Sequence, residues 1–516
     1  MSIESIRLKG AARGESFQRT MIMATCMLAA SIYSMNLTIV AISLPHMQGT
    51  FSATPDQVSW VVTGFILGLT MMIACIGWIA DQLGRKKVYL ICMAAFVFAS
   101  VMCGNAHTLE EEVLWRFLQG VSGAGILPLS QSIILDVYPR EQHSRVLGIW
   151  GLGNMAGPII APPIGGMITE AYSWHNVFDI NIPAGLLALL GAVLFVPSTP
   201  PARRELDVVG VITLVSGLGL IQLMVNRGAR QDWFESTEII LELIAGLALI
   251  YVFIIHILTT RKPFLNPVIF RDRNYAVGIV VITSFGVFSF LPIVMLPLFM
   301  RNLMEYPVQV IGILLVPRAL GVVIGNLTVS RLVRYIDPRH LITMGLICTM
   351  YSSWHVSTWT LDVSVWEIAV NGVFQGLGNG LIYVTVNTLT FYDLPPKHRS
   401  QAVPLFYLTF NIAASIGIAG FITYWVQSTQ INHAVLTEHI SPFNELLRGG
   451  FMPHARELHA ARAAALNQEI TRQASLIGFE ISFQLVTFVA FATIPFVYLM
   501  RNPWAKKVAA PKSGTG

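Results

Sequence analysis

The sequence predicts an all-α polytopic membrane protein of fourteen transmembrane helices, built as two six-helix halves plus two inserted helices. Three observations predict this class. First, 54% of the 516 residues are hydrophobic and only 12% are charged, whereas soluble domains carry nearer ~25% charged residues. Second, apolar runs of about 20 residues, enough to cross a ~30 Å bilayer core, recur along the chain. Third, the two halves of the chain resemble each other.

The apolar runs and the Lys and Arg residues together predict a topology. Of the 33 Lys and Arg residues, 24 fall in predicted cytoplasmic segments and 7 in outside loops, and Arg116 and Arg318 lie within spans. This positive-inside bias places both termini in the cytoplasm. No cleavable signal peptide is expected, because the first apolar run is too long and lacks a small-residue cleavage site. The predicted spans are 21–44, 56–80, 88–104, 113–135, 146–168, 178–197, 208–226, 238–258, 275–299, 308–330, 340–359, 365–391, 403–427 and 479–500.

An internal repeat divides the chain. The sequence FLQGVSGAG at 117–125 resembles VFQGLGNGL at 373–381, which sets Gln119 opposite Gln375. The loop at 77–86 has a weaker counterpart at 330–339. Duplicated six-span halves are typical of secondary transporters with a substrate site near the bilayer midplane. The predicted parts are a cytoplasmic segment (1–20), a first bundle (21–200), an inserted helix pair (207–258), a second bundle with its outside loop (275–500) and a cytoplasmic tail (501–516).

Two neighbouring spans carry unusual residues. Arg116 lies within the fourth span, where a charge costs at least ~2.5–3.5 kcal/mol on insertion scales. It either reaches the outer interface with its long side chain or faces an inward polar surface with Gln119, one turn later. The fifth span contains small and helix-bending residues, which let helices approach closely and flex. These are Gly157, Pro158, Pro162, Gly165 and Gly166.

The loop between the second and third spans predicts a cytoplasmic charge latch. Its glycines permit a tight turn, and an aspartate there can pair with an arginine or a helix N-terminus. The alternative is an ordinary basic cytoplasmic loop. The residues are Gly77, Asp81, Gly84, Arg85 and Lys86.

A proton-driven machine needs an acidic or imidazole group that changes charge within the membrane. Asp179, at the start of the sixth span, is the acidic candidate, with helix capping as its alternative role. Arg318 follows Pro317, and its side chain is expected to bond the carbonyls that this proline frees; its role is open between function and structure. Aromatic and amide side chains that could line a cavity, or simply pack, are Trp60, Phe65, Trp150 and Asn154.

Other site chemistries are not indicated. The five cysteines lie within apolar segments and no two are spaced as metal ligands, so neither a metal nor a cofactor is expected. The net charge of +5 follows from topology and does not indicate a nucleic-acid partner. The long outside loop at 428–477 carries an apolar stripe typical of an amphipathic helix. This helix either packs on the outer face of the bundle or forms a docking surface.

These features resemble a known family, the fourteen-helix drug:proton antiporters of the major facilitator superfamily, and within it the EmrB type. The resemblance covers nearly the whole chain. It is carried by GWIADQLGRK (77–86), RFLQG (116–120), GPIIAPPIGG (157–166), WHNVFDINIPAG (174–185), NRGARQDWFES (226–236), VPRALG (316–321) and HAVLTEHISPFN (433–444).

The resemblance implies proton-coupled export of drugs and other amphipathic compounds across a Gram-negative inner membrane. It assigns proton coupling to Arg116 and an antiporter role to the Gly/Pro motif at 157–166. It also implies a tripartite pump with a periplasmic adaptor of the EmrA kind and an outer-membrane channel of the TolC kind. The chain departs from the family at Asn36, where an aspartate is usual. Further departures are Gln82 for Arg, Ala161 for Gly and Phe410 for Arg.

Three alternatives follow from the sequence. Export of one endogenous lipid-like or siderophore substrate fits an apolar cavity equally well. An uncoupled facilitator is favoured by Asn36, which cannot titrate. A membrane-embedded enzyme or sensor is disfavoured, because the sequence has no HExxH or GxSxG motif and no His-rich loop.

Overall fold

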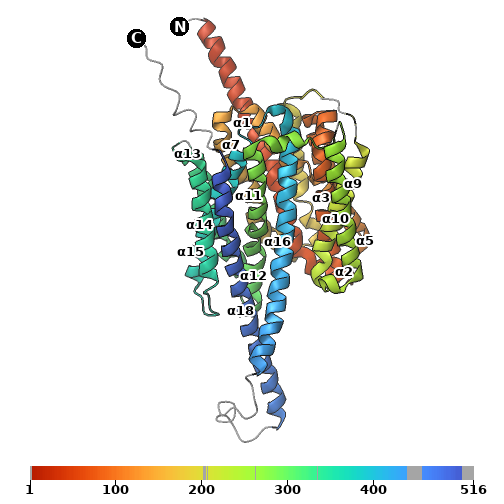
Figure 1. Cartoon of the computed structure of the whole chain (residues 1–516), viewed down its shortest axis with the longest axis vertical. Helices are drawn as coiled ribbons and strands as arrows, with labels where there is room; N and C mark the ends of the chain where they lie inside the picture. The colour runs from red at the N-terminus through yellow and green to blue at the C-terminus, as the bar shows by residue number, and fades with distance from the viewer. Residues whose placement is uncertain are drawn as a thin grey trace.

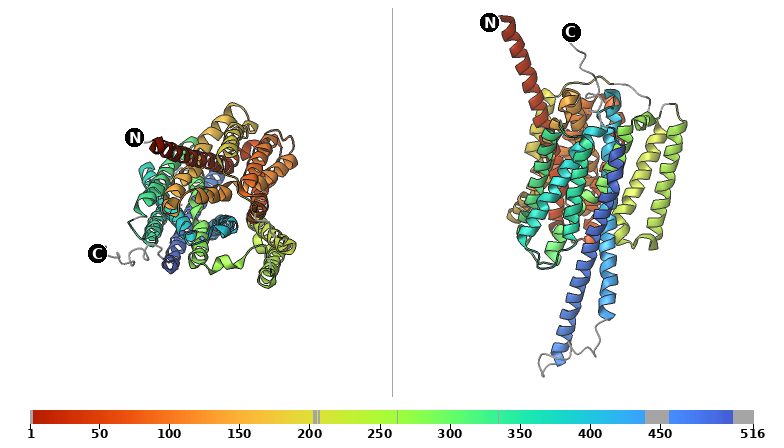
Figure 2. Two further views of the ribbon diagram at one scale, coloured as in Figure 1. Left: turned by 90° about the horizontal axis from the view of Figure 1, so that it is seen from above. Right: turned by 60° about the vertical axis from the view of Figure 1, so that its left-hand side comes forward.

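The computed structural model describes residues 3–201, 205, 207–261, 263–333, 335–438 and 456–501, and these contain helices and no strand. The helices form one bundle from which two long helices project at one end (Figure 1). The start of the first helix and the end of the last lie together at the opposite end (Figure 2). A chain that crosses a membrane an even number of times has both of its ends on the same side.

The first six predicted spans fall on α1 (Ile3–Thr50), α3 (Trp60–Leu83), α4 (Arg85–Gly104), α5 with α6 (Leu109–Gly123, Ile126–Val137), α7 (His143–Ala171) and α8 (Asn181–Phe195). The short elements α2 (Pro55–Val58), η1 (Arg140–Gln142) and η2 (Trp174–Val177) join them. Thr108 caps α5 by accepting a hydrogen bond from the Glu111 N–H, as short hydroxyl side chains do at helix starts. The fourth span, predicted as one helix, is split at Ala124 and Gly125.

The inserted pair consists of α9 (Val208–Arg227) and α10 (Thr237–Thr259), with η3 (Gly228–Arg230) and η4 (Trp233–Glu235) between them. The pair lies at the edge of the bundle (Figure 2), where α9 packs on α3 and α16. Asp207 caps α9 by accepting from the Gly210 N–H.

The remaining spans fall on α11 with α12 (Arg273–Ser289, Leu291–Asn302), α13 (Val308–Leu332), α14 (Pro338–Val356), α15 (Val365–Thr390), α16 (Pro396–Glu438) and α18 (Arg456–Leu499), preceded by η5 (Pro267–Arg271). The ninth span is split at Phe290, because Pro292 falls in the first turn of α12 and starts a new helix there. Asp272, Asp337 and Ser364 cap α11, α14 and α15.

All fourteen predicted segments are therefore helical. Eleven helical stretches of the described chain are long and apolar enough to cross a membrane. The three predicted spans outside that set are α7, α14 and α15, each of which is a helix of at least 19 residues. A membrane protein of many apolar helices is thus established, while the count of fourteen crossings stays a prediction.

The internal repeat is present in the packing. On α5, a Cβ at Gly120 would lie 2.0 Å from the carbonyl oxygen of Phe65 on α3. On α15, a Cβ at Gly376 would lie 1.9 Å from the carbonyl oxygen of Arg318 on α13. Gly120 and Gly376 are the residues next to the aligned Gln119 and Gln375. The sequence repeat thus places glycines where two helix pairs, far apart in the chain, make the same close backbone approach.

The segment predicted as a long outside loop consists largely of helix. α16 runs on to Glu438 and α18 begins at Arg456, so both helices extend beyond the bundle (Figure 1). His433 and Asn467 join them through side-chain atoms 3.0 Å apart. The described part of this segment projects away from the bundle, which does not support a helix packed flat on the outer face. Residues 439–455 lie outside the described chain.

Candidate functional site

Arg116 is fully buried, with 1% of its surface exposed, at the meeting point of α1, α3 and α5. Its Nη1 donates to the Asn36 Oδ1 at 2.6 Å and to the Gln119 Oε1 at 2.5 Å, and its Nε donates to the Val61 carbonyl at 3.3 Å. The guanidinium lies 4.4 Å from the centre of the Phe65 ring. The side chain therefore faces the inside of the bundle, and the snorkelling alternative is wrong.

The acceptors of Arg116 are all neutral. In the described chain no carboxylate forms an ion pair with its guanidinium, and Asn36 supplies an amide oxygen where the resemblance leads us to expect an aspartate. The amide nitrogens of Asn36 and Gln119 are buried and have no hydrogen-bond partner among the described residues. A buried cation held only by amide and carbonyl oxygens is costly, so such a site favours the approach of an anion.

The carboxyl group of Glu112 is buried one turn before Arg116 on the same helix. Glu112 is 0% exposed, and both of its carboxylate oxygens lack hydrogen-bond partners within the described chain. The sequence reasoning missed this residue, because three glutamates in the first turn of a helix normally face solvent and offset the helix dipole. The available signal was the four-residue spacing to Arg116, which puts the two side chains on one face.

Asp179, the acidic candidate from the sequence, lies in a different setting. It is exposed, and its carboxylate accepts a hydrogen bond from the Asn176 side chain at 2.9 Å. It does not cap α8, whose preceding residue is Ile180. No described contact brings Asp179 to Arg116. Its proposed proton role therefore gains no support from its position.

The Gly/Pro motif of the fifth span lies in α7, which is one continuous helix packed along α1. A Cβ at Gly157 would lie 2.2 Å from the Ser31 carbonyl oxygen, and one at Gly165 would lie 2.5 Å from the Ile39 side chain. Gly166 faces open space. Pro158 is half-buried, and the Pro162 side chain lies outside the described part. The motif thus allows α7 to approach the helix that carries Asn36.

At the end of the bundle where α1 begins, a cluster of ion pairs joins the first six-helix part of the chain to the second. We call this cluster the clasp. Asp136, at the end of α6, forms ion pairs with Arg85 and with Arg399 of α16. Arg399 also donates to the Leu135 carbonyl at 2.9 Å. The negative charge of Asp81 also stabilises the Arg85 guanidinium.

The other residues of the predicted latch lie beside the clasp. A Cβ at Gly77 would lie 2.4 Å from the Ser400 carbonyl oxygen on α16, so this glycine permits a close contact between the two parts of the chain. Gly84 adopts a φ of +86°, a conformation that favours glycine. Lys86 donates to the Val193 carbonyl at 2.8 Å. The predicted latch residues thus gather around a charge cluster, to which Asp136 and Arg399 are additions.

A second contact between the two parts is a buried polar network. Gln131 of α6 donates to the Asn387 Oδ1 of α15 at 2.9 Å and accepts from the Tyr407 hydroxyl of α16 at 2.6 Å. The Tyr383 hydroxyl donates to that of Tyr407 at 3.2 Å. The Tyr383 ring lies beside Phe410, the position at which the resemblance leads us to expect arginine. Aromatic rings with hydroxyl and amide groups suit amphipathic ligands.

Arg318 differs from its expectation. Its Nη2 donates to the Ser289 carbonyl at the end of α11, at 3.1 Å, and not to the carbonyls that Pro317 frees within α13. Its Nε is buried without a hydrogen-bond partner, and no described carboxylate pairs with it. The kink-satisfying role is therefore wrong in this arrangement, and the guanidinium keeps donor capacity for another group.

The four residues suggested for a cavity lie in separate places. Phe65 contacts Arg116, whereas the Trp60 ring lies 5.5 Å from the Arg227 guanidinium at the inserted pair. Trp150 is 1% exposed, and its indole N–H has no partner within the described chain. Asn154 is held by the Ser34 hydroxyl. They do not line one pocket.

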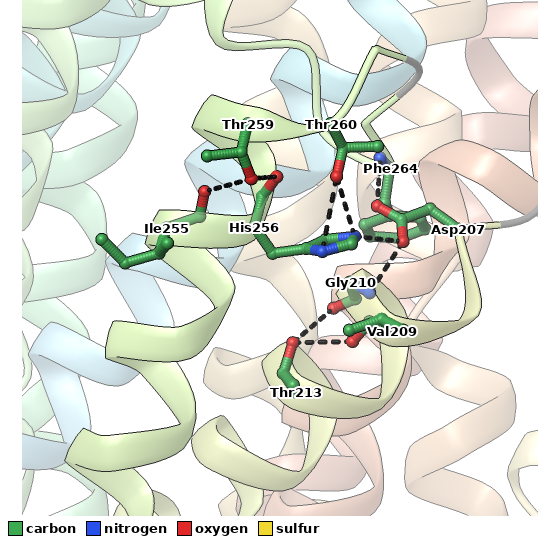
Figure 3. Close-up of polar contacts among 9 residues, drawn as sticks. All are labelled: Asp207, Val209, Gly210, Thr213, Ile255, His256, Thr259, Thr260 and Phe264. Carbon is green, nitrogen blue, oxygen red and sulfur yellow. Dashed lines mark hydrogen bonds and ion pairs between the residues drawn. The ribbon is translucent and has the colours of Figure 1, made fainter.

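The inserted pair is fastened to the bundle by Asp207 (Figure 3). Its carboxylate accepts from the N–H groups of Gly210 and Phe264 at 2.9 and 3.0 Å, and lies 2.6 Å from the His256 Nε2. Burial alone would raise the pKa of Asp207, but these three donors outweigh it and hold the pKa below its ordinary value of 3.8. One aspartate therefore ties together α9, α10 and the segment leading to the second bundle.

The chain matches the family model described as Major Facilitator Superfamily over residues 26–418. It is 29% identical over 485 residues to the multidrug export protein EmrB of Haemophilus influenzae, covering 92% of this chain and 94% of that protein. The EmrB of Escherichia coli K12 is 28% identical with the same coverage. The fatty acid resistance protein FarB of Neisseria gonorrhoeae is 26% identical, covering 92% of this chain and 95% of FarB.

Solved structures show the same fold. The human organic anion transporter MFSD10 aligns with a TM-score of 0.59 at 12% identity, over 92% of this chain and 99% of that one. The proton:xylose symporter XylE aligns with a TM-score of 0.58 at 12% identity, over 93% and 97%. At such identities the likeness concerns the arrangement of helices alone.

Proposed function

The chain belongs to the major facilitator superfamily, and from this membership we propose that it exports amphipathic and hydrophobic compounds, such as drugs, in exchange for protons. It is a multi-pass membrane transporter of the multidrug-export type, related along 92% of its length to the EmrB proteins. The observation that carries the proton-coupled proposal is the fully buried Arg116, which has only neutral acceptors and a buried carboxyl group one turn away.

Proton coupling needs a buried charged group whose electrostatic cost differs between two states of the transporter. Arg116 supplies the cation, and a proton or a substrate that binds nearby alters the electrostatic cost of keeping it there. Asn36 and Gln119 hold the guanidinium in one position, and the α1–α7 packing at Gly157 and Gly165 lets the α1 helix that bears Asn36 sit close to α7. In this proposal, movement between α1 and α7 is linked to the charge at Arg116.

Alternating access requires the two parts of the chain to separate at one end and then at the other. The Asp136 clasp and the Gly77–Ser400 contact close the end of the bundle where α1 begins. We place this end in the cytoplasm, from the positive-inside bias. A transporter that is closed at its cytoplasmic end is in the outward-facing state of the transport cycle. The Gln131 network lies between the two parts, where a substrate would contact both.

The projecting helices α16 and α18 support the proposal of a tripartite pump in an inner membrane. They extend from the end opposite to the clasp, which is the periplasmic end in this topology (Figure 1). A periplasmic adaptor of the EmrA kind, joined to an outer-membrane channel of the TolC kind, would bind there. Shortening both helices by matched turns beyond Asn432 should abolish adaptor co-purification but leave transport in liposomes intact.

A second candidate is the export of anionic amphiphiles such as fatty acids. It is favoured by Arg318, a cation that keeps an unused buried donor and has no carboxylate partner in the described chain. The relative FarB is named for fatty acid resistance. Arg318→Gln should then reduce oleate export much more than export of the cationic dye rhodamine 6G. Equal losses would count against an anion-binding role.

The proposed function is tested in liposomes that contain only the purified protein. A proton gradient that favours proton influx is imposed, while dye efflux and internal pH are followed together. Efflux that rises with the gradient, and acidification that rises with efflux, would support antiport. Dye movement that ignores the gradient would support the uncoupled facilitator that Asn36 also permits.

A further inference from the structure

Three consecutive glutamates open α5, and only the third is inside the protein. Glu110 and Glu111 are exposed, and the Glu111 carboxylate accepts from the His107 N–H at 2.9 Å. Glu112 is 0% exposed, and neither of its oxygens has a hydrogen-bond partner within the described chain. The helix dipole and the cap at Thr108 account for an acidic first turn. They do not account for a buried carboxyl group without partners.

Among the described residues, Arg116 and Cys103 are the ionisable groups that act on Glu112. Arg116 lies one turn later on the same helix, and the Cys103 thiol acts on Glu112 from α4. The neighbouring residues that contact Arg116 from α1 and α3 are Asn36, Val61 and Phe65, none of which titrates. A buried carboxyl group whose donor within the described chain is at most the weak Cys103 thiol is costly as an anion and much less costly as a neutral acid.

We propose that Glu112 binds and releases the transported proton, and that Arg116 pairs with its carboxylate after the proton leaves. The inference rests on the proposed function, proton-driven export, and assigns its proton site. A proton from the outside water forms an O–H bond with Glu112; on release this bond breaks and the proton passes to water on the other side. The Nη1 of Arg116 then exchanges the amide oxygens of Asn36 and Gln119 for the Glu112 carboxylate, and no electrons are transferred.

This assignment explains the departure at position 36. The family's usual aspartate on α1 would place a carboxylate where the Asn36 amide oxygen lies, 2.6 Å from Arg116. Here that position is neutral, and the carboxyl group comes instead from α5, on the same helix as Arg116. Both arrangements place one acid beside one buried arginine, so the chemistry of proton exchange is kept while the acid moves to another helix.

The test compares Glu112→Gln, which removes the proton site but keeps the shape, with two matched controls. Glu111→Gln changes the exposed neighbour, and Cys103→Ser changes the other nearby ionisable group. Purified proteins in liposomes are assayed with rhodamine 6G and with oleate, first for gradient-driven efflux and then for exchange without a gradient. Infrared difference spectra between acidic and neutral pH record the C=O band of a carboxyl group that gains a proton.

We expect Glu112→Gln to lose gradient-driven efflux down to the level of empty liposomes, to retain exchange, and to lose one carboxyl band. Both controls should keep the efflux and the band. Coupling or a band that survives in Glu112→Gln overturns the proposal. A wild type that ignores the gradient with both probes overturns proton-driven export instead, and the infrared band then decides alone whether Glu112 exchanges a proton.

A second variant guards against misfolding. Glu112→Asp keeps the carboxyl group but withdraws it by one methylene from Arg116. It should retain the infrared band with a changed pH midpoint, and should retain coupled efflux with a changed pH profile. A band and a profile identical to those of the wild type would show that the group responsible lies elsewhere.

Discussion

Arg399 and Asp136, which lie 263 residues apart in the sequence, form an ion pair at 3.2 Å across the two parts of the bundle. Only 3% of the Arg399 side chain is exposed, and Arg85 pairs with the same carboxylate. Two cations therefore share the Asp136 carboxylate at the closed end. A carboxylate shared in this way stabilises the closed arrangement, because either cation without it would be poorly solvated.

Replacing Asp136 should open this end of the bundle. Asp136→Asn removes the carboxylate that Arg85 and Arg399 share and leaves only Asp81, among the described residues, to offset their charges, which should cost the closed state about 1–3 kcal/mol. A cysteine at position 326, in a protein without the five native cysteines, reports opening because Asn326 is buried against Gly148 and Gly151 of α7. Its reaction with a water-soluble maleimide should become about tenfold faster, as a shift of ~1.4 kcal/mol predicts.

The matched control for the clasp is Glu110→Gln, an exposed acid at the opposite end of the bundle. Its labelling rate should equal that of the parent. Equal rates for Asp136→Asn and the parent would show that the ion pairs do not hold this end closed.

A methyl group at Gly120 should destabilise the first bundle. The added Cβ would lie 2.0 Å from the Phe65 carbonyl oxygen, which is backbone and cannot rotate away, so α3 and α5 must separate. Overpacking of this kind costs about 1–3 kcal/mol. We expect a lower thermal unfolding midpoint in detergent for Gly120→Ala, and a similar loss for Gly376→Ala in the second bundle.

Gly420→Ala is the comparison for these glycine variants, since nothing lies within 4 Å of its added Cβ. Its midpoint should stay at the wild-type value or rise slightly, because alanine favours helix over glycine. If Gly120→Ala and Gly420→Ala have the same unfolding midpoint, the close approach of α3 and α5 is not a source of stability.

The Asp207 fastening should depend on pH in one direction. The pKa of Asp207 is depressed in the folded protein, by the backbone donors and His256 acting against burial. A depressed carboxyl pKa contributes stability above the unfolded value of about 3.9, and this stability is lost as pH falls through the folded value. Asn can still cap α9 through its amide oxygen, so Asp207→Asn removes only the charge. It should therefore lower the free energy of unfolding at neutral pH by about 1 kcal/mol, the difference between hydrogen bonds to a charged and to a neutral acceptor.

The difference between wild type and Asp207→Asn should shrink once the pH falls below about 4. Asp362→Asn, an exposed aspartate in the loop between α14 and α15, serves as the reference and should match the wild type across this range. A difference that is constant with pH would mean that the carboxylate charge at position 207 is not what matters.

The sequence predicts the helical segments well, because the length of an apolar run is a local property of the chain. The repeat also aligns Gly120 with Gly376, and the structure shows that each lies at a close backbone approach between two helices. Arg116 and Gln119 are predicted on one inward face from their three-residue spacing, and their hydrogen bond confirms it. Spacing along one helix is thus enough where both partners lie on that helix.

Contacts between distant segments could not be predicted. Nothing in the sequence links Asp136 to Arg399, and only the fold brings the two side chains together. Glu112 was hidden by its two exposed neighbours, because a run of identical residues gives no sign of which one turns inward. Asp179 was favoured by its predicted position at the start of the sixth span, yet it is exposed and accepts a hydrogen bond from Asn176. Burial of an individual carboxyl group depends on helix rotation, which apolar patterns fix only coarsely.

Restoring the family's acid on α1 should separate the role of position 36 from that of Glu112. Asn36→Asp places a carboxylate where the amide oxygen now accepts from Arg116 at 2.6 Å. The new ion pair should hold Arg116 more firmly and add a second group able to exchange a proton. In Glu112→Gln, where gradient-driven efflux is expected to be lost, the added Asn36→Asp should raise it again by about tenfold, the effect of roughly 1.4 kcal/mol of differential interaction.

The rescue is measured as gradient-driven rhodamine 6G efflux from liposomes. Its reference is Glu112→Gln with Ser31→Asp, an acid on the same helix at a position whose backbone carbonyl contacts Gly157 of α7. Only the acid at position 36 adjoins Arg116, so only that pair should recover coupling. Recovery with both acids would mean that any charge on α1 suffices. Recovery with neither would mean that the geometry of Glu112, one turn before Arg116, is itself required.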